Sequence, residues 1–153
     1  IALLIGQQRR HSYVDVEQAY RDFTAARDLP CLIAKAEEAG GEEAGAEACR
    51  RLLAEHPALD AICAPVDAFA VGAIRALQQA GRRVPEEVKV VTRYDGLRAQ
   101  KCQPPLTAVN LHLEEVSARA ISLLLAHING KEAPDIVRGP SPELIVRASS
   151  CRS

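Results

Sequence analysis

The sequence predicts an α/β domain with a mostly parallel sheet and helices on both of its faces. Short apolar runs, typical of buried strands, alternate with longer segments in which apolar residues recur every three or four positions. The chain has 153 residues, the size of one compact unit, and 48% of them are hydrophobic, which is enough to build a core. This alternation favours strands that are joined by right-handed helical crossovers.

Three strand–helix pairs are expected in the first part of the chain. The apolar runs are short and adjoin a Gly or Pro, namely Gly6, Pro30 and Pro65, which predicts strands at 1–5, 31–34 and 61–64. Each run is followed by a stretch with one apolar face, which predicts helices at about 13–27, 43–55 and 68–80. Pro57 and Gly81 mark the ends of the second and third helices.

The second part of the chain departs from strict alternation. A fourth strand is expected at 88–92, followed by a loop at 96–105 and a short strand at 106–109. The apolar stripe over 113–128 is the clearest helical pattern in the sequence, and Asn129-Gly130 caps it. The run 143–148 predicts a final strand.

Charge and composition exclude several classes of protein. Nineteen basic and twenty acidic residues leave a net charge of −1, which argues against a nucleic-acid-binding module within this chain. No apolar run approaches the roughly 20 residues that span a bilayer, so no membrane contact is expected. The five cysteines and four histidines lack metal-ligand spacing, and neither a metal nor a cofactor is expected. Cys31, Cys49 and Cys63 are interpreted as small buried hydrophobes in a reducing compartment.

Motifs of the common enzyme classes are absent. The first strand is followed by Gly6-Gln7-Gln8, with no GxGxxG, and the chain has no GxxxxGK[ST] loop and no GxSxG elbow. His11 and Ser12 are adjacent, but no third group that would orient a catalytic pair is evident. The chain is therefore predicted not to be an enzyme.

Candidate ligand contacts follow the predicted strands, because ligands bind at the carboxyl ends of parallel strands. Asp67 follows the third strand, where it is either the N-cap of the next helix or a ligand contact. Asp95 follows the fourth strand and starts no helix, and its carboxylate can accept two hydrogen bonds from a sugar diol. Arg9, Ser12 and Arg93 belong to the same edge, and the two arginines either bind an anion or are solvated.

Four motifs resemble the effector-binding domain of LacI/GalR-family transcriptional regulators. They are D-A-x-x-A-x-x-D-x-x-A-x-G-A from Asp60, A-G-x-x-V-P-E-x-V-x-V-V from Ala80, the pair Tyr94-Asp95, and P-P-L-T-x-V from Pro104. The resemblance covers nearly the whole chain. It implies a fold like that of periplasmic sugar-binding proteins, with two lobes and a ligand between them.

The resemblance also implies how the chain is divided. Residues 1–103 would form the C-terminal lobe, 104–135 would return to the N-terminal lobe, and 136–153 would supply the final strand and tail. The chain begins on a strand and without Met, so it is expected to be a piece of a longer polypeptide. The N-terminal lobe and the helix-turn-helix that binds operator DNA would lie outside it.

Only some of the family's ligand-contacting residues are found at the matching positions of this sequence. The Asp of the family's G-[FY]-D motif falls on Asp95, while the preceding Gly is Arg93. The family's Ala-Asn-Asp keeps its acid as Asp67 but has Val66 in place of Asn, and the family's ligand Arg falls on Val16. We therefore expect a sugar or related metabolite as effector, but not a common hexose bound in the usual way.

The family also implies a cytoplasmic homodimer. The helix at 68–80, through Phe69, Val71 and Ile74, matches the segment that pairs across the two-fold axis; the alternative is that its own lobe covers this helix. The alternative is a periplasmic solute-binding receptor of a sugar transporter, which would share the fold and the cleft. A helix-turn-helix upstream of this chain would favour the regulator, and a signal peptide would favour the receptor.

Overall fold

A single mixed sheet of six strands organises the chain. The computed structural model describes residues 1–151. The strand order is β2-β1-β3-β4-β5-β6, in which the first five strands are parallel and β6 runs antiparallel to β5. The strands are β1 (Ala2–Gly6), β2 (Leu32–Ala36), β3 (Ala61–Ala64), β4 (Lys89–Thr92), β5 (Thr107–Asn110) and β6 (Glu143–Ile145). The predicted α/β fold with a mostly parallel sheet is thus confirmed.

The helices follow the expected pattern with small differences at their ends. They are α1 (His11–Ala25), α2 (Gly41–Glu55) with the 3-10 turn η1 (Glu38–Gly40) before it, α3 (Asp67–Gln79), α4 (Leu97–Lys101) and α5 (Leu113–Ile128). Helix α4 occupies the segment expected to be a loop, because a single turn is too short to show helical periodicity. Helix α1 begins at His11 rather than near residue 13, so Ser12 lies in its first turn.

Strand β1 separates two clusters of buried side chains. Its side chains alternate between the two faces of the sheet. Leu4 belongs to the larger cluster, which it shares with α2 and α3. Leu3 and Ile5 belong to the smaller cluster, where they pack against Tyr13 and Tyr20 of α1. Helices therefore cover both faces of the sheet, as the sequence predicts.

Two glycines allow α2 and α3 to approach each other closely. A Cβ added at Gly72 would overlap the carbonyl oxygen of Glu42 and lie 2.7 Å from the nitrogen of Ala46. A Cβ at Gly45 would lie 2.5 Å from the Cα of Phe69. The packing of this helix pair against the sheet therefore requires hydrogen at both positions.

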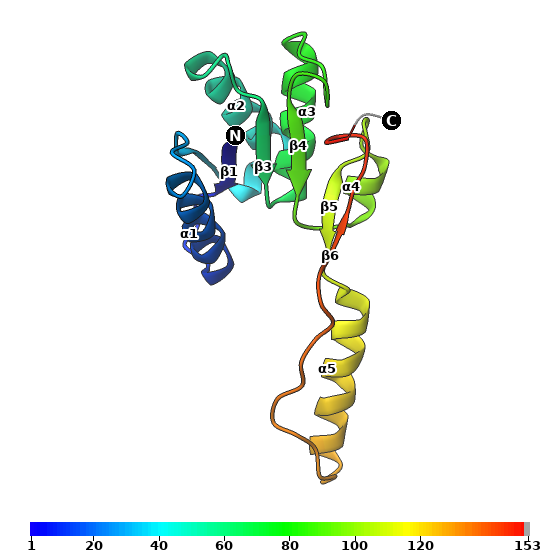
Figure 1. The fold of residues 1–153 in the computed structure, drawn as a ribbon. Helices are drawn as coiled ribbons and strands as arrows, with labels where there is room; N and C mark the ends of the chain where they lie inside the picture. Colours follow the sequence, from blue (N-terminus) through cyan, green and yellow to red (C-terminus); the bar gives the residue numbers. More distant parts are fainter. Residues whose placement is uncertain (152–153) are drawn as a thin grey trace.

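Helix α5 and residues 129–142 form an arm that extends beyond the sheet (Figure 1). The returning loop runs along the helix, and Arg119 donates a hydrogen bond to the carbonyl of Arg138 at 2.8 Å. No side chain of α5 is buried, and its exposed apolar residues are Leu113, Val116, Ile121, Leu124, Leu125 and Ile128. Within residues 1–151, none of the helices is both long enough and apolar enough to cross a bilayer.

Gly72→Ala is expected to lower the free energy of unfolding by about 1–3 kcal/mol, because overpacking outweighs the gain of about 1 kcal/mol in helix propensity. Gly96→Ala is the matched control, since Gly96 has a φ of −96° and no atom within 4 Å of an added Cβ. Urea unfolding of both variants measures the difference. Equal stability of the two would show that α2 and α3 do not pack as described.

The exposed face of α5 is expected to make this chain associate into dimers or larger species, with exchange of the segment 104–135 as one route. Light scattering coupled to size exclusion measures the mass. Leu124→Glu with Leu125→Glu should restore the monomer, whereas Leu97→Glu, which changes an exposed leucine of α4, should not. A monomeric wild-type chain at high concentration would contradict this expectation.

Candidate functional site

The carboxyl ends of the four strands β1 to β4 bring their following loops to one edge of the sheet. These loops begin after Gly6, Ala36, Ala64 and Thr92. We call them together the carboxyl edge, defined as residues 7–12, 37–40, 65–67 and 92–98. All five predicted ligand contacts belong to this edge, which is the place where ligands bind in sheets of this type.

Unpaired buried polar atoms concentrate at the carboxyl edge. Within residues 1–151, six buried side-chain nitrogen or oxygen atoms lack a hydrogen-bond partner. Five of these six lie at the edge: Gln8 Oε1, Glu38 Oε1, Thr92 Oγ1, Arg93 Nε and Asp95 Oδ1. Since a buried polar atom without a partner costs about 1–3 kcal/mol, such a group of atoms calls for a functional explanation.

Asp95 is held by Arg147, which lies just beyond β6. Nη2 of Arg147 is 2.6 Å from Oδ1 of Asp95, and the two side chains are only 20% and 11% exposed. The approach does not meet hydrogen-bond geometry, so the contact is ionic and Oδ1 stays without a hydrogen-bond donor. Asp95 faces a hollow of about 700 Å³ that Asn110, His112 and Glu114 also line. A ligand in this hollow would reach the carboxylate.

Asp67 links α3 to α4 instead of capping α3. The N-cap residue is Val66, and Asp67 is the first residue of the helix, so the N-cap alternative is wrong. Oδ1 of Asp67 accepts the N–H of Ala68 at 2.8 Å. Nη1 of Arg98 lies 3.3 Å from both carboxylate oxygens, and Nε of Arg98 is 3.4 Å from Glu42. Asp67 is therefore already engaged by a cation.

Arg93 packs on its neighbour and faces a different hollow from Asp95. Its guanidinium lies 4.7 Å from the centre of the Tyr94 ring, and Nη2 donates to the Tyr94 hydroxyl at 2.7 Å. With Val16 and Cys63 it lines an apolar hollow of about 470 Å³ on the sheet face beside α1. The structure places Arg93 and Asp95 at the same edge but not in the same hollow.

Arg9 and Ser12 lie at the far end of the edge. Arg9 is exposed and lines a hollow of about 400 Å³ together with Gln8 and Tyr13. Ser12 is exposed in the first turn of α1 and does not line this hollow. The five predicted contacts are thus spread along the edge, and Asp95 is the one whose carboxylate is both nearly buried and directed to a large hollow.

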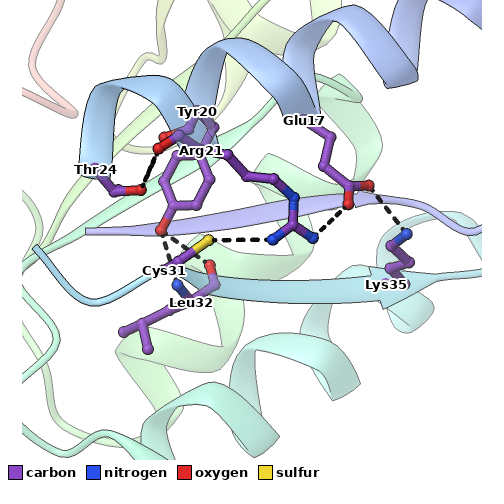
Figure 2. Close-up of polar contacts among 7 residues, drawn as sticks. All are labelled: Glu17, Tyr20, Arg21, Thr24, Cys31, Leu32 and Lys35. Carbon is purple, nitrogen blue, oxygen red and sulfur yellow. Dashed lines mark hydrogen bonds and ion pairs between the residues drawn. The ribbon is translucent and has the colours of Figure 1, made fainter. Parts of the chain in front are cut away.

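Helix α1 is fixed to β2 by polar contacts that set the position of the edge (Figure 2). The Tyr20 hydroxyl accepts the N–H of Leu32 at 3.0 Å and lies 3.1 Å from the carbonyl of the same residue. Glu17 pairs with Arg21 at 2.7 Å and with Lys35 at 3.0 Å. Hydrogen bonds from these two cations hold the pKa of Glu17 below its ordinary value.

The cysteines differ in exposure: Cys49 is buried, Cys63 and Cys102 are half-buried, and Cys31 and Cys151 are exposed. Burial raises the pKa of the Cys49 thiol to about 12, and it also raises the pKa of Cys63 and Cys102. The expected buried position is confirmed for Cys49, only partly met by the half-buried Cys63, and wrong for the exposed Cys31. Cys31 lies at the surface just before β2, where Arg21 Nη1 is 3.7 Å from its sulfur. Residues 1–151 contain no group of His, Cys, Asp and Glu arranged to hold a metal ion.

The predicted dimer contacts differ in their exposure. Phe69 and Ile74 are buried in the core of this chain, so neither side chain has surface to offer a partner. They pack in the cluster between α2, α3 and the sheet. Val71 is half-buried and is the one of the three that retains exposed surface.

Four residues of the site lay outside the sequence prediction: Gln8, Glu38, Thr92 and Arg147. Gln8 and Thr92 adjoin strand ends, and a search for polar residues at those ends would have included them. Glu38 lies in the turn η1, whose existence the sequence did not indicate. Arg147 is far from Asp95 in the sequence, and no local pattern connects the two.

Comparison with known proteins relates nearly the whole chain to one family. Residues 1–150 match the family described as a periplasmic binding protein-like domain. The HTH-type transcriptional regulator CelR of Thermobifida fusca is 32% identical over 152 residues, which are 97% of this chain and 44% of that protein. The lactose operon repressor of Rhizobium radiobacter is 36% identical over 108 residues, which are 71% of this chain and 95% of that sequence. The chain spans less than half the length of CelR.

Solved structures agree with this relationship. A complex of the transcriptional regulator CelR with cellobiose superposes with a TM-score of 0.83 at 31% identity. The match covers 97% of this chain and 46% of the CelR chain. A fold shared over that length at that identity indicates common descent of this half of the domain.

Glu17→Gln is expected to lower the free energy of unfolding at pH 7 by about 1 kcal/mol or less, because Arg21 and Lys35 are half-exposed and screened by water. A carboxylate whose pKa is lowered in the folded state stabilises the protein above its ordinary pKa of 4.5 and loses this effect as the pH falls. The difference in the free energy of unfolding between E17Q and the wild type should therefore shrink as the pH falls from 5 to about 3.

Urea unfolding at several pH values measures this dependence. Glu37→Gln is the control, since Glu37 is exposed and forms no ion pair within residues 1–151. A stability difference for E17Q that stays constant down to pH 3 would contradict the role given to the ion pairs.

Proposed function

The chain belongs to the LacI/GalR family of transcriptional regulators, within their periplasmic binding protein-like domain, and from this premise we propose that it senses a small-molecule effector. Effector binding would shift the geometry of the domain and thereby change the affinity of the whole regulator for operator DNA. One observation carries the proposal: Asp95 is a nearly buried carboxylate at the carboxyl edge, and it faces a hollow of about 700 Å³. A ligand in this hollow would reach that carboxylate.

The chemistry of these atoms favours a ligand rich in hydroxyl groups. Asp95 offers a carboxylate, and Gln8 Oε1 and Glu38 Oε1 are buried acceptors that receive no hydrogen bond within residues 1–151. A sugar or related polyol offers several O–H donors at the spacing of a ring, and it carries no charge that would compete with Arg147 or Arg98. The relative CelR, which binds cellobiose in its solved structure, supports a sugar as the effector class.

The site of this chain is one side of a two-lobed cleft. The arm supports this arrangement, because its apolar face is uncovered here and would pack into the other lobe. The segment 104–135 is predicted to return to the other lobe, and β5 at its start lies between β4 and β6 in the sheet. We propose that the part that enters the other lobe is 111–142, with the lobe of this chain at 1–110 and 143–151.

The remaining partners follow from the same family. Operator DNA would bind through a helix-turn-helix domain outside this chain, and the regulator would act in the cytoplasm as a homodimer. Val71 would contribute to the dimer interface, whereas Phe69 and Ile74 would not. The related proteins are transcriptional regulators, which supports this function over an enzyme and over a receptor of a sugar transporter.

Titration with cellobiose and with lactose tests the proposal, followed through the backbone amide signals of Gln8 and Gly96 by NMR. Asp95→Asn should weaken binding about tenfold, because hydrogen bonds to a charged group contribute about 1.5–3 kcal/mol. Asp135→Asn is the matched control, since Asp135 is exposed on the arm loop. Unchanged affinity in the Asp95 variant would refute the site, and absence of any shift in the wild type would refute these sugars as ligands.

A further inference from the structure

We propose that Arg147 is a positioning residue that fixes the Asp95 carboxylate for the effector and connects the effector site to the C-terminal segment. The C-terminal segment is defined here as residues 146–151. The proposal rests on the proposed function, because it concerns the same carboxylate. The further step is that Arg147, which lies outside the carboxyl edge, holds the Asp95 carboxylate in the orientation that binds the effector.

The guanidinium of Arg147 bridges two parts of the lobe. Nη2 is 2.6 Å from Asp95 Oδ1, and Nη1 donates to the carbonyl of Leu106 at 2.9 Å. The planar fork of an arginine holds both contacts in one fixed geometry. Within residues 1–151, Asp95 has no other ion-pair partner. The direction in which its carboxylate points is therefore set by Arg147.

The main chain of Arg147 is itself immobilised by β5. Its N–H donates to Thr107 Oγ1 at 2.8 Å, and its carbonyl oxygen lies 3.0 Å from the same hydroxyl. Thr107 is almost fully buried, so these contacts are protected from water. Because the arginine backbone is fixed in this way, the Asp95 side chain adapts to Arg147 rather than the reverse.

Ser149 fastens the C-terminal segment to both β4 and β5. It is fully buried, its hydroxyl donates to the carbonyl of Val90 at 2.6 Å, and it accepts the N–H of Thr107 at 2.8 Å. The N–H of Val90 donates in turn to the Ser149 carbonyl at 2.9 Å. The segment thus joins the strand that ends beside Asp95 to the strand that leads into the arm. A displacement of β5 and β6 would move Arg147 and, with it, the carboxylate.

The ion pair of Asp67 with Arg98, at the same edge, is longer and more exposed than that of Asp95 with Arg147. Asp67 and Arg98 are 22% and 49% exposed, their closest contact is 3.3 Å, and Arg98 is shared with Glu42. The contact between Asp95 and Arg147 is shorter, both side chains are less exposed to solvent, and neither residue forms another ion pair within residues 1–151. Loss of one partner from a nearly buried pair leaves an uncompensated charge, whereas a water-exposed pair tolerates that loss. Arg98 is therefore the natural control for Arg147.

The test compares Arg147→Gln with Arg98→Gln, using cellobiose and lactose as probes and NMR amide shifts as the readout. Arg147→Gln should weaken binding about tenfold and Arg98→Gln less than about twofold. In the Asp95→Asn background, Arg147→Gln should cause no further loss, because the two residues act as one unit. Arg147→Lys keeps the charge without the fork and should fold even where the Gln variant does not, with an intermediate affinity.

Several outcomes would overturn the proposal. If Arg147→Gln binds the sugar with the affinity of the wild type, the positioning role is refuted, while the proposed function stands. Additive losses in the double variant would assign Arg147 a general structural role. If neither sugar binds the wild type, the proposed function fails for these ligands, and the Asp95 χ1 angle, measured by three-bond couplings, still decides the role of Arg147. We expect one χ1 rotamer in the wild type and averaging in Arg147→Gln, and an unchanged single rotamer would refute positioning.

Discussion

The burial of β1 on both faces is the constraint on which the rest of the structure depends. All five of its residues are buried, and their side chains alternate between the cluster under α2 and α3 and the cluster under α1. When both faces of a strand are buried, its side chains must be apolar, so polar residues are found only at or beyond its ends. Because its neighbours β2 and β3 run parallel to it, their polar residues collect at the same carboxyl edge. The location of the candidate site is therefore a consequence of the packing of one apolar strand.

The arm and the candidate site are connected through β5 and β6. These strands are the antiparallel pair that leads out of the sheet and back, and the C-terminal segment follows directly after them. Arg147 lies in that segment and contacts both Asp95, which follows β4, and the carbonyl of Leu106, which precedes β5. The part of the chain with its apolar surface uncovered is thus joined by a short chain of buried polar contacts to the carboxylate at the edge. This geometry suits a domain in which ligand binding and lobe movement are linked.

Much of the fold was accessible from the sequence, and the reasons for the exceptions are physical. The strand at 61–64 and the helix at 113–128 have the bounds that were predicted, because their apolar patterns are long or bounded by Pro and Gly. Helix α4 was missed because five residues show no periodicity, and its position depends on tertiary contacts such as the ion pair of Arg98 with Asp67.

The site was only partly predictable. Asp95 could be identified from its place after a buried strand and from the resemblance, but its partner Arg147 is distant in the sequence and close only in the fold. The most direct measurement is a crystal structure of the regulator that contains this chain, grown with cellobiose or lactose. We expect sugar hydroxyls within hydrogen-bond distance of Asp95 and Gln8. A sugar bound away from the carboxyl edge, with the unpaired atoms of the edge satisfied by water alone, would contradict the proposed site.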